Sequence, residues 1–401
     1  MGSKKIKKKI LPEKNLKNVF TQEMLRVLKL LGMIDSWRRL SPELRDVFTS
    51  SIVRLPRFER DKNSGISAEI IDALKMDMGV IYDLQMVNID EFNTSISLHD
   101  CLTVVISLLR SIGEFIDEDE PDYREWMKVG DALHNLINKG ENNPTILFDL
   151  NIDNLVCICS EIEKNFYWFE LTYHYSFAAE PYFCPVYTLK KTPAEKRYVC
   201  IDGNSRPVYR IGFPDIDKIE WASVAGKLLG ENFGEEYRLP VYIQSHALER
   251  MIERLNPVGK PSIQLMLVVA LENPEISSGP GGVQLIALRY YGAKIGYMVF
   301  DIVDNMIIIK TFLLITQNGT HEGNKLNREY NLSKYIKSYF ELDKLYTYIK
   351  TDVYNDEELK KLFTQCGCGD LFNLWEKNDL DAMSFDENYA ANLKKIFFAQ
   401  N

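Results

Sequence analysis

The chain has 401 residues, of which 46% are hydrophobic and 26% are charged, and its formal net charge is −9. This length exceeds what one hydrophobic core usually supports, so we expect two or more domains in a globular protein. The moderate negative charge argues against a protein that coats nucleic acid with its whole surface, and any polyanion site would have to be local.

The sequence shows none of the signals typical of a membrane helix, a secretory signal or a nucleotide site. No apolar run approaches the roughly 20 residues that a membrane helix requires, and the lysine-rich start is not followed by the apolar stretch of a secretory signal. The seven cysteines are scattered, which favours reduced thiols and a cytoplasmic location. We find no phosphate-binding loop, dinucleotide-binding glycine motif or nucleophile elbow, so no nucleotide cofactor is expected.

Two cysteine pairs have one intervening residue, whereas zinc ribbons prefer two to four. Cys157 and Cys159 lie in an apolar run, so we expect them to be buried as small hydrophobic residues. Cys366 and Cys368 lie between glycines in an expected flexible loop, where burial and a redox or metal role are both open. We expect no metal requirement, because neither pair has a nearby histidine.

The first part of the chain is predicted to be helical. Residues 1–20 form an expected flexible basic tail, which is either a solvated terminus or an arm for nucleic acid or a membrane surface. Residues 21–160 form a helical region, with a capped start at Thr21 and a second at Ser41-Pro42. Apolar periodicity predicts further helices at residues 68–74, 101–112 and 123–137.

Residues 161–238 are predicted to be β-rich and antiparallel. Aromatic and β-branched runs indicate the strands, at residues 166–173, 197–201 and 207–211. His174 alternates with aromatic neighbours, and we expect a packed or surface role rather than catalysis. The aromatic strands also leave open a small-molecule site.

Residues 239–330 are predicted to form a strand, two helices and a three-stranded antiparallel meander. The three meander strands are joined by tight turns and cover residues 283–291, 294–303 and 306–316. Residues 331–401 are again helical, at residues 335–349, 357–363 and 390–398. The predicted fold class is therefore α+β, with helices at both ends and a β-rich middle.

The first helix of residues 239–330 is strongly amphipathic. At 100° per residue, Arg250 and Arg254 lie roughly 40° and 80° from His246. The opposite side carries an apolar stripe that we expect to be buried, formed by Leu248, Met251, Ile252 and Leu255. The polar face is either a site or a solvated surface on which glutamates pair with the arginines.

The residue types on this polar face suit acid–base and phosphate chemistry. His246 follows Ser245, the expected helix cap, where free N–H groups and the helix dipole favour a neutral imidazole that can act as a base. Two arginines can neutralise a phosphodiester and its transition state. The candidate catalytic residues are therefore His246, Arg250 and Arg254.

The string His246-Ala247, Glu249-Arg250-Met251 and Glu253-Arg254, ahead of a second helix and a meander, resembles toxin-like domains related to the BrnT and RelE ribonuclease toxins. It matches their "HAxERMxER" start over residues 239–318. The resemblance implies a compact ααβββ domain that, in the toxins, cleaves RNA without metal through basic and aromatic groups. Cationic or stacking substrate contacts are then candidates on the strands and after them, at Arg289, Tyr290, Lys294, Tyr297 and His321.

Three functions follow as alternatives. The first is a toxin-like domain that binds or cleaves RNA without metal. The second is a non-catalytic scaffold with the same fold and another protein as its partner, and the third is small-molecule binding by the aromatic strands. A site is needed to separate them, because one fold supports many functions.

Overall fold

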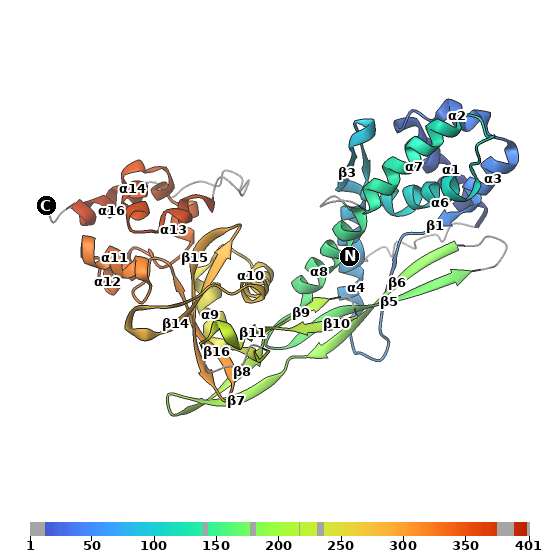
Figure 1. Ribbon diagram of the computed structural model, residues 1–401. Helices are drawn as coiled ribbons and strands as arrows, with labels where there is room; N and C mark the ends of the chain where they lie inside the picture. The colour runs from blue at the N-terminus through green and yellow to red at the C-terminus, as the bar shows by residue number, and fades with distance from the viewer. Residues whose placement is uncertain are drawn as a thin grey trace, which may run out of the picture. The chain divides into compact units, whose positions relative to one another are not determined.

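The structure is a computed structural model that describes residues 13–138, 143–176, 182–215, 217–230, 236–374 and 389–398. The chain forms two compact units (Figure 1). Unit 1 comprises Met1–Leu155, Trp168–Lys191 and Ile216–Lys218, and unit 2 comprises Val156–Tyr167, Thr192–Asp215 and Ile219–Asn401. Residues 1–12 of the predicted basic tail lie outside the described residues.

Unit 1 is mainly helical. Its helices are α1 (Glu13–Leu30), α2 (Ile34–Arg39), α3 (Pro42–Ser50), α4 (Ala68–Leu84), α5 (Leu98–Asp100), α6 (Ile106–Phe115), α7 (Tyr123–Asn138) and most of α8 (Pro144–Cys159). The Ser41 hydroxyl caps α3 by accepting from Leu44 N, as the sequence predicts. The Phe48 ring packs between those of Trp37 and Trp126, at centroid distances of 5.8 and 5.7 Å, and holds α3 against α2 and α7.

The strands of unit 1 pair in both directions. They are β1 (Ile52–Val53), β2 (Arg57–Arg60), β3 (Met86–Ile89), β4 (Thr94–Ser97) and much of β5 (Asn165–Ser176) and β6 (Tyr182–Pro193). Strand β6 pairs with β5 and runs parallel to β1 and β2. The β-rich region is therefore not wholly antiparallel, because β6 pairs with strands from the helical part of the chain.

Unit 2 is built on an eight-stranded sheet with the order β13-β14-β15-β16-β12-β8-β7, where β11 also pairs with β12. Its strands are β7 (Lys196–Ile201), β8 (Asn204–Arg210), β11 (Ser223–Ala225), β12 (Arg238–Gln244), β13 (Ile276–Ser278), β14 (Gln284–Tyr290), β15 (Ala293–Val303) and β16 (Met306–Leu314). Strand β12 is parallel to β16 and antiparallel to β8. Segments from the predicted β-rich region and the predicted toxin-like domain thus share one sheet.

Tight turns join the predicted hairpins of this sheet. Both central residues have positive φ at each turn, which are Asp202-Gly203, Tyr291-Gly292 and Asp304-Asn305. This geometry is that of two-residue turns that match the twist of antiparallel strands. The predicted meander of β14, β15 and β16 is confirmed in its order and its pairing.

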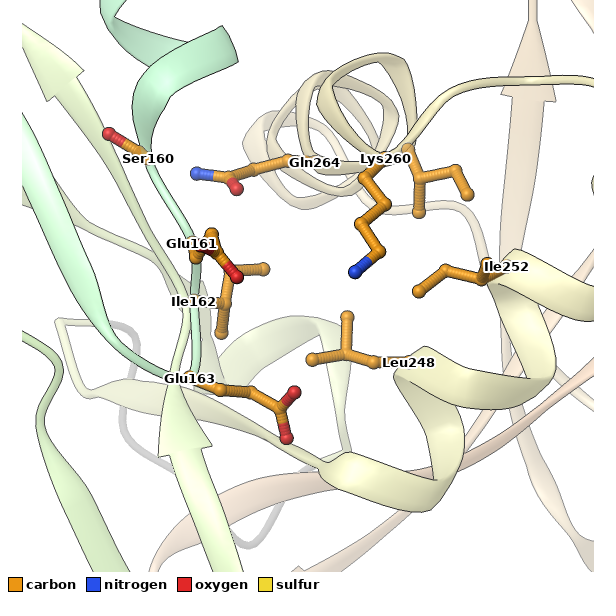
Figure 2. Close-up of a pocket in the computed structure, with 9 residues that line it drawn as sticks. Ser160, Glu161, Ile162, Glu163, Leu248, Ile252, Lys260 and Gln264 are labelled. Atoms are coloured by element: carbon orange, nitrogen blue, oxygen red, sulfur yellow. The ribbon is translucent and has the colours of Figure 1, made fainter. Parts of the chain in front are cut away.

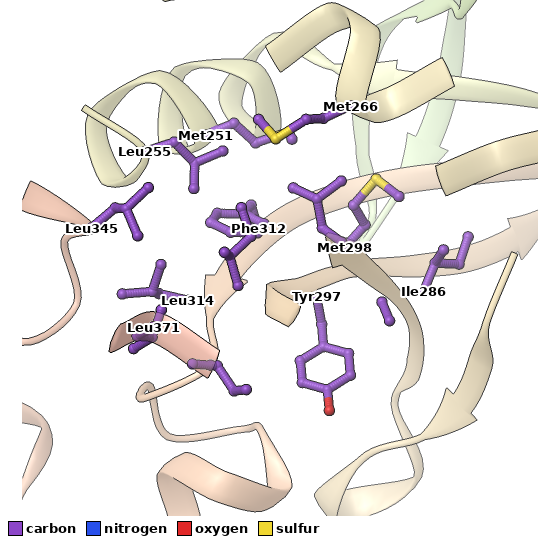
Figure 3. Packing of buried hydrophobic residues seen from close by; sticks show 14 of the residues in the cluster. Met251, Leu255, Met266, Ile286, Tyr297, Met298, Phe312, Leu314, Leu345 and Leu371 are labelled. Carbon is purple, nitrogen blue, oxygen red and sulfur yellow. The ribbon is translucent and has the colours of Figure 1, made fainter. Parts of the chain in front are cut away.

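Helices α9 (Ser245–Arg254) and α10 (Lys260–Glu272) pack on this sheet. The remaining helices follow the last strand and are α11 (His321–Tyr330), α12 (Lys334–Tyr339), α13 (Tyr346–Lys350), α14 (Glu357–Gln365) and α16 (Tyr389–Phe398). Figure 3 shows α9 side chains and Leu345 and Leu371 of the C-terminal part gathered around Phe312 and Leu314 of β16. No helix in the described ranges is both long and apolar enough to cross a bilayer.

The apolar stripe of α9 is largely buried, as predicted. Leu248, Met251 and Leu255 are buried in the core of unit 2, whereas Ile252 is partly buried against it. The amphipathic pattern therefore identified the packed side of this helix.

Three predicted boundaries were wrong. Helix α1 begins at Glu13, so Thr21 lies inside it and is not its cap. The predicted helix at residues 335–349 is broken into α12 and α13, because Glu341 adopts a left-handed conformation with φ of 46°. The helices after the meander begin at His321 and not at residue 335, because Thr320 caps α11 through Gly323 N.

Candidate functional site

The predicted catalytic residues on α9 lie in different surroundings. The His246 side chain is 54% exposed, and its Nδ1 lies 4.0 Å from Glu249 Oε2. Gln244, and not Ser245, is the N-cap residue, and no side chain caps this helix. His246 is not among the residues that line the cavity beside Arg250 and Arg254. The structure therefore does not bring the histidine and the two arginines into one pocket.

The two arginines also differ from each other. Arg250 Nη1 donates to Glu253 Oε2 at 2.6 Å in an exposed pair. Arg254 Nη1 instead donates to the backbone carbonyl of Phe312 on β16, and its own carbonyl accepts from Leu345 N at 2.7 Å. Burial lowers the pKa of Arg254, although Asp343 opposes the shift. Arg254 therefore ties α9 to β16 and to the chain before α13.

A polar cavity of about 580 Å³ lies beside these arginines. Four cationic side chains and two acidic ones line it, together with polar residues of the loop after β16. The lining residues are Arg250, Glu253, Arg254, Leu313, Gln317, Asn318, Gly319, Lys334, Lys337, Ser338 and Asp343. We call this space the α9–α12 cavity. Its lining has an excess of positive charge within an acidic chain.

Lys337 is the most unusual residue of the α9–α12 cavity. It is 2% exposed, and its Nζ donates to Asn318 Oδ1 at 2.7 Å and to the Gly323 carbonyl at 2.5 Å. Burial lowers its pKa to about 8, against the influence of Cys368 and Cys366. Within the described ranges no carboxylate forms an ion pair with Lys337. Neutral dipoles alone stabilise this cation, so a bound anion would be favoured.

The local backbone explains how Lys337 finds these acceptors. Thr320 caps α11, and the loop with Gln317 and Asn318 folds back against the first turn of this helix. Gly323 is required there, because an added Cβ would lie 1.9 Å from the Gln317 carbonyl oxygen. The close approach presents the Asn318 amide and the Gly323 carbonyl to Lys337.

One half-buried acid, Asp343, lies in the same cavity. Asp343 accepts from Gln317 Nε2 at 3.4 Å. Burial raises the pKa of Asp343, and the attraction of Arg254 only partly offsets this effect. The cavity therefore sets one acid, whose charged form burial disfavours, beside its cations.

Two exposed tyrosines lie on the helix that lines the cavity. Tyr335 and Tyr339 are 78% and 70% exposed. Their rings stack, with centroids 6.4 Å apart and an interplanar angle of 22°. Exposed tyrosine rings have an apolar face and a polar hydroxyl, a combination that suits a binding surface. The sequence analysis missed them and Lys337, although the spacing of Lys334, Tyr335, Lys337 and Tyr339 within one short helix was a readable signal.

The predicted substrate-binding residues do not line this cavity. Arg289 forms a two-point ion pair with Glu275 at 2.8 and 3.1 Å. The Tyr290 ring contacts that of Tyr291 edge to face at 4.6 Å. His321 Nε2 lies 3.0 Å from the Ser278 carbonyl. These side chains hold strands β13 and β14 and their neighbours together.

Lys294 and Tyr297 form a second cluster around Glu322. Lys294 Nζ and the Tyr297 hydroxyl donate to Glu322 Oε1 at 2.7 and 2.9 Å. Burial opposes the charge of Lys294, but the Glu322 carboxylate prevails and raises its pKa. Lys294 also lies over the Tyr297 ring at 5.4 Å. The Glu322 carboxylate already accepts from Lys294 and Tyr297, and these contacts link β15 to α11.

The remaining candidates are mostly packed. The Phe166 ring packs on Trp221, and the Phe169 ring packs on Phe58 and Tyr187, so these aromatic side chains fill cores. His174 is exposed.

The second cysteine pair lies in a turn that follows α14, outside the helices, as the sequence predicts. Cys366 and Cys368 are both buried, and burial raises the pKa of both thiols. Such thiols are poor nucleophiles. Over the described ranges, no group of three or more histidine, cysteine, aspartate or glutamate side chains could hold a metal.

The resemblance to BrnT and RelE toxins over residues 239–318 stays a prediction. Comparisons with known proteins found no matching family model, no matching curated protein and no matching solved structure.

Proposed function

We propose that unit 2 binds single-stranded RNA at the α9–α12 cavity. A backbone phosphate occupies the cavity beside Lys337 and Lys334, and neighbouring bases stack on Tyr335 and Tyr339. The observation that carries the proposal is a buried lysine without a carboxylate partner on the same helix as two exposed, stacked tyrosines. This joins a phosphate-binding group and a base-binding group on one short helix.

The electrostatics support phosphate as the anion. Lys337 is held by an amide and a carbonyl, so a phosphate oxygen would supply the negative charge that its surroundings lack. Lys334 is exposed on the preceding turn, and Arg250 lies across the cavity. Phosphate contacts of this kind give affinity without sequence preference and weaken as salt increases.

The tyrosines support a single strand rather than a duplex. Unpaired bases present their faces, and stacking on an aromatic side chain contributes about 1–3 kcal/mol per base. In a duplex, the bases are already stacked on one another and their faces are covered. The i, i+4 spacing of Tyr335 and Tyr339 offers two such platforms along α12.

The geometry favours binding over cleavage. General acid–base catalysis needs a group within hydrogen-bond reach of the reacting proton. His246 is absent from the lining of the cavity, and Arg254 is engaged with the Phe312 carbonyl. We therefore propose an RNA-binding domain in which the toxin-like helix α9 forms one wall of the site, without turnover.

Fluorescence anisotropy of a labelled single-stranded RNA of mixed sequence tests the proposal. We expect binding by the full chain, with an affinity that falls as salt rises. The double variant Tyr335→Ala/Tyr339→Ala should weaken binding by about tenfold or more, because one lost base stack already costs about 1–3 kcal/mol. Lys334→Ala should also lower the slope of log affinity against log salt by about one.

Matched controls separate the site from general surface effects. Tyr198 is 68% exposed on β7 beside Lys196, and Lys227 is an exposed lysine away from the cavity. Tyr198→Ala and Lys227→Ala should bind RNA as the unaltered protein does. Absence of RNA binding at low salt, or equal losses in site and control variants, would reject the proposal.

A further inference from the structure

A second pocket lies on another side of α9 and is separate from the α9–α12 cavity. It has a volume of about 70 Å³ and is lined by Ser160, Glu161, Ile162, Glu163, Leu248, Ile252, Lys260, Ile263 and Gln264. All these residues belong to unit 2. Figure 2 shows their side chains around one space between α9, α10 and residues 160–163. We call it the α9–α10 pocket.

Gln264 points to a bound ligand. Its side chain is 5% exposed, and Figure 2 shows it directed into the pocket. Its Nε2 finds no hydrogen-bond partner among the residues that the structure describes. A buried amide left unpaired costs about 1–3 kcal/mol. An acceptor atom of a ligand in the pocket would remove this cost.

Opposite charges line the pocket on different elements. Lys260, on the first turn of α10, is exposed and has no ion pair within the described ranges. Glu161 and Glu163 lie on the segment before β5, and Glu161 pairs with Lys164 at 2.8 Å. Figure 2 shows the Lys260 ammonium and the Glu163 carboxylate at different places on the wall. The pocket thus offers a cation and two carboxylates that do not neutralise each other directly.

Apart from Ser160, the rest of the wall is apolar. Leu248 and Ile263 are buried, and Ile252 is partly buried beside them. These aliphatic side chains make the pocket favourable for a short hydrocarbon group. Lys260, Glu161 and Glu163 are exposed, so the pocket is open to solvent on its charged side. The volume of about 70 Å³ holds a short hydrocarbon group and excludes a folded partner.

We propose that the α9–α10 pocket binds a free aliphatic α-amino acid. Its carboxylate accepts from the Gln264 amide and pairs with Lys260 near the N-terminus of α10, where the helix dipole also favours negative charge. Its ammonium group pairs with Glu161 or Glu163. Its side chain packs on Leu248, Ile252 and Ile263. A zwitterion with an aliphatic side chain therefore matches the cationic, the acidic and the apolar parts of the pocket lining.

Isothermal titration calorimetry of the full chain with L-leucine tests this proposal. Three partial analogues serve as probes: 4-methylpentanoate lacks the ammonium group, isoamylamine lacks the carboxylate, and glycine lacks the side chain. We expect leucine to bind and each analogue to bind at least about tenfold more weakly, because each loses one charged or apolar contact. Binding of 4-methylpentanoate as tightly as leucine would overturn the amino-acid assignment.

Substitutions in the lining test whether leucine binds at the α9–α10 pocket. Lys260→Met and Gln264→Leu should each weaken leucine binding by about tenfold or more, whereas the control Lys227→Met should not change it. Lys260 is exposed, so its variant keeps the test valid even if Gln264→Leu perturbs folding. No heat of binding with leucine at millimolar concentration, or unchanged binding by Lys260→Met, would overturn the proposal. The Tyr335→Ala/Tyr339→Ala variant should bind leucine normally, so this outcome is independent of RNA binding.

Discussion

The two sides of helix α9 meet different partners. Leu248 and Ile252 face the α9–α10 pocket, whose wall is largely apolar with charges from other segments. Arg250 and Arg254 face the α9–α12 cavity, whose wall is polar and mainly cationic. One amphipathic helix therefore contributes to two spaces of opposite character. The difference shows that a polar helix face within a larger chain need not be a solvated surface.

The largest expected effect is the pH dependence of stability that Lys337 in the α9–α12 cavity causes. Burial lowers the pKa of Lys337 to about 8 in the folded protein, against an ordinary lysine pKa of about 10.5 in the unfolded chain. Between these values the unfolded state binds more protons, so the contribution of Lys337 to the free energy of unfolding increases as pH rises. The full gain is roughly 3–4 kcal/mol, because the pKa difference is about 2.5 and each unit corresponds to about 1.4 kcal/mol.

Urea unfolding at several pH values between 7.5 and about 10.5 measures this effect, since the pKa shift places it in that window. The unaltered protein should gain stability relative to Lys337→Met across the window. Comparing Lys337→Met with the unaltered protein cancels much of the contribution of Cys366 and Cys368, which also titrate at alkaline pH. The control Lys334→Met replaces an exposed lysine on the same helix and should keep the pH dependence. Parallel curves for Lys337→Met and the unaltered protein would contradict the burial of an uncompensated cation.

The second expected effect is a difference in stability between variants of Arg254 and Arg250, which lie on neighbouring turns of α9. Arg254→Met removes a charged donor from the Phe312 carbonyl, and we expect a loss of about 1.5–3 kcal/mol in the free energy of unfolding. Arg250→Met breaks an exposed pair with Glu253 and should cost less than about 0.5 kcal/mol. Chemical denaturation at pH 7 compares the two. Equal effects would show that the two arginines have similar roles.

The smallest effect is expected at His246. Its side chain is exposed and its nearest acid lies 4.0 Å away, so His246→Ala should change stability by less than about 0.5 kcal/mol. RNA incubated with either protein should stay intact, as gel electrophoresis can establish. RNA cleavage that His246→Ala abolishes without unfolding would instead favour the toxin-like catalytic hypothesis.

The sequence predicted the packing of the sheet better than the site. Short apolar runs and two-residue turns identify β14, β15 and β16, because each signal is local. The 3.6-residue periodicity also identifies the buried side of α9. Local patterns could not predict that β12 lies between β16 and β8, or that β6 pairs with β1 and β2, because these are contacts between distant segments.

The same limit explains the candidate site. His246, Arg250 and Arg254 share a face by helical geometry, but the covering of that face by α12 depends on a later part of the chain. Lys337 looks like an ordinary helix lysine until Asn318 and the Gly323 carbonyl surround it. Glu322 likewise captures Lys294 and Tyr297 from another element. Partners distant in sequence thus decide which polar side chains are available.

Photo-crosslinking tests the central claim, RNA contact at the α9–α12 cavity, most directly. A single-stranded RNA with 4-thiouridine would be irradiated with the full chain, and the crosslinked peptides identified by mass spectrometry. We predict crosslinks to the α12 peptide that carries Tyr335 and Tyr339, and their loss in Tyr335→Ala/Tyr339→Ala but not in Tyr198→Ala. Crosslinks confined to other parts of unit 2 or to unit 1, with the α12 peptide unmodified, would contradict the account.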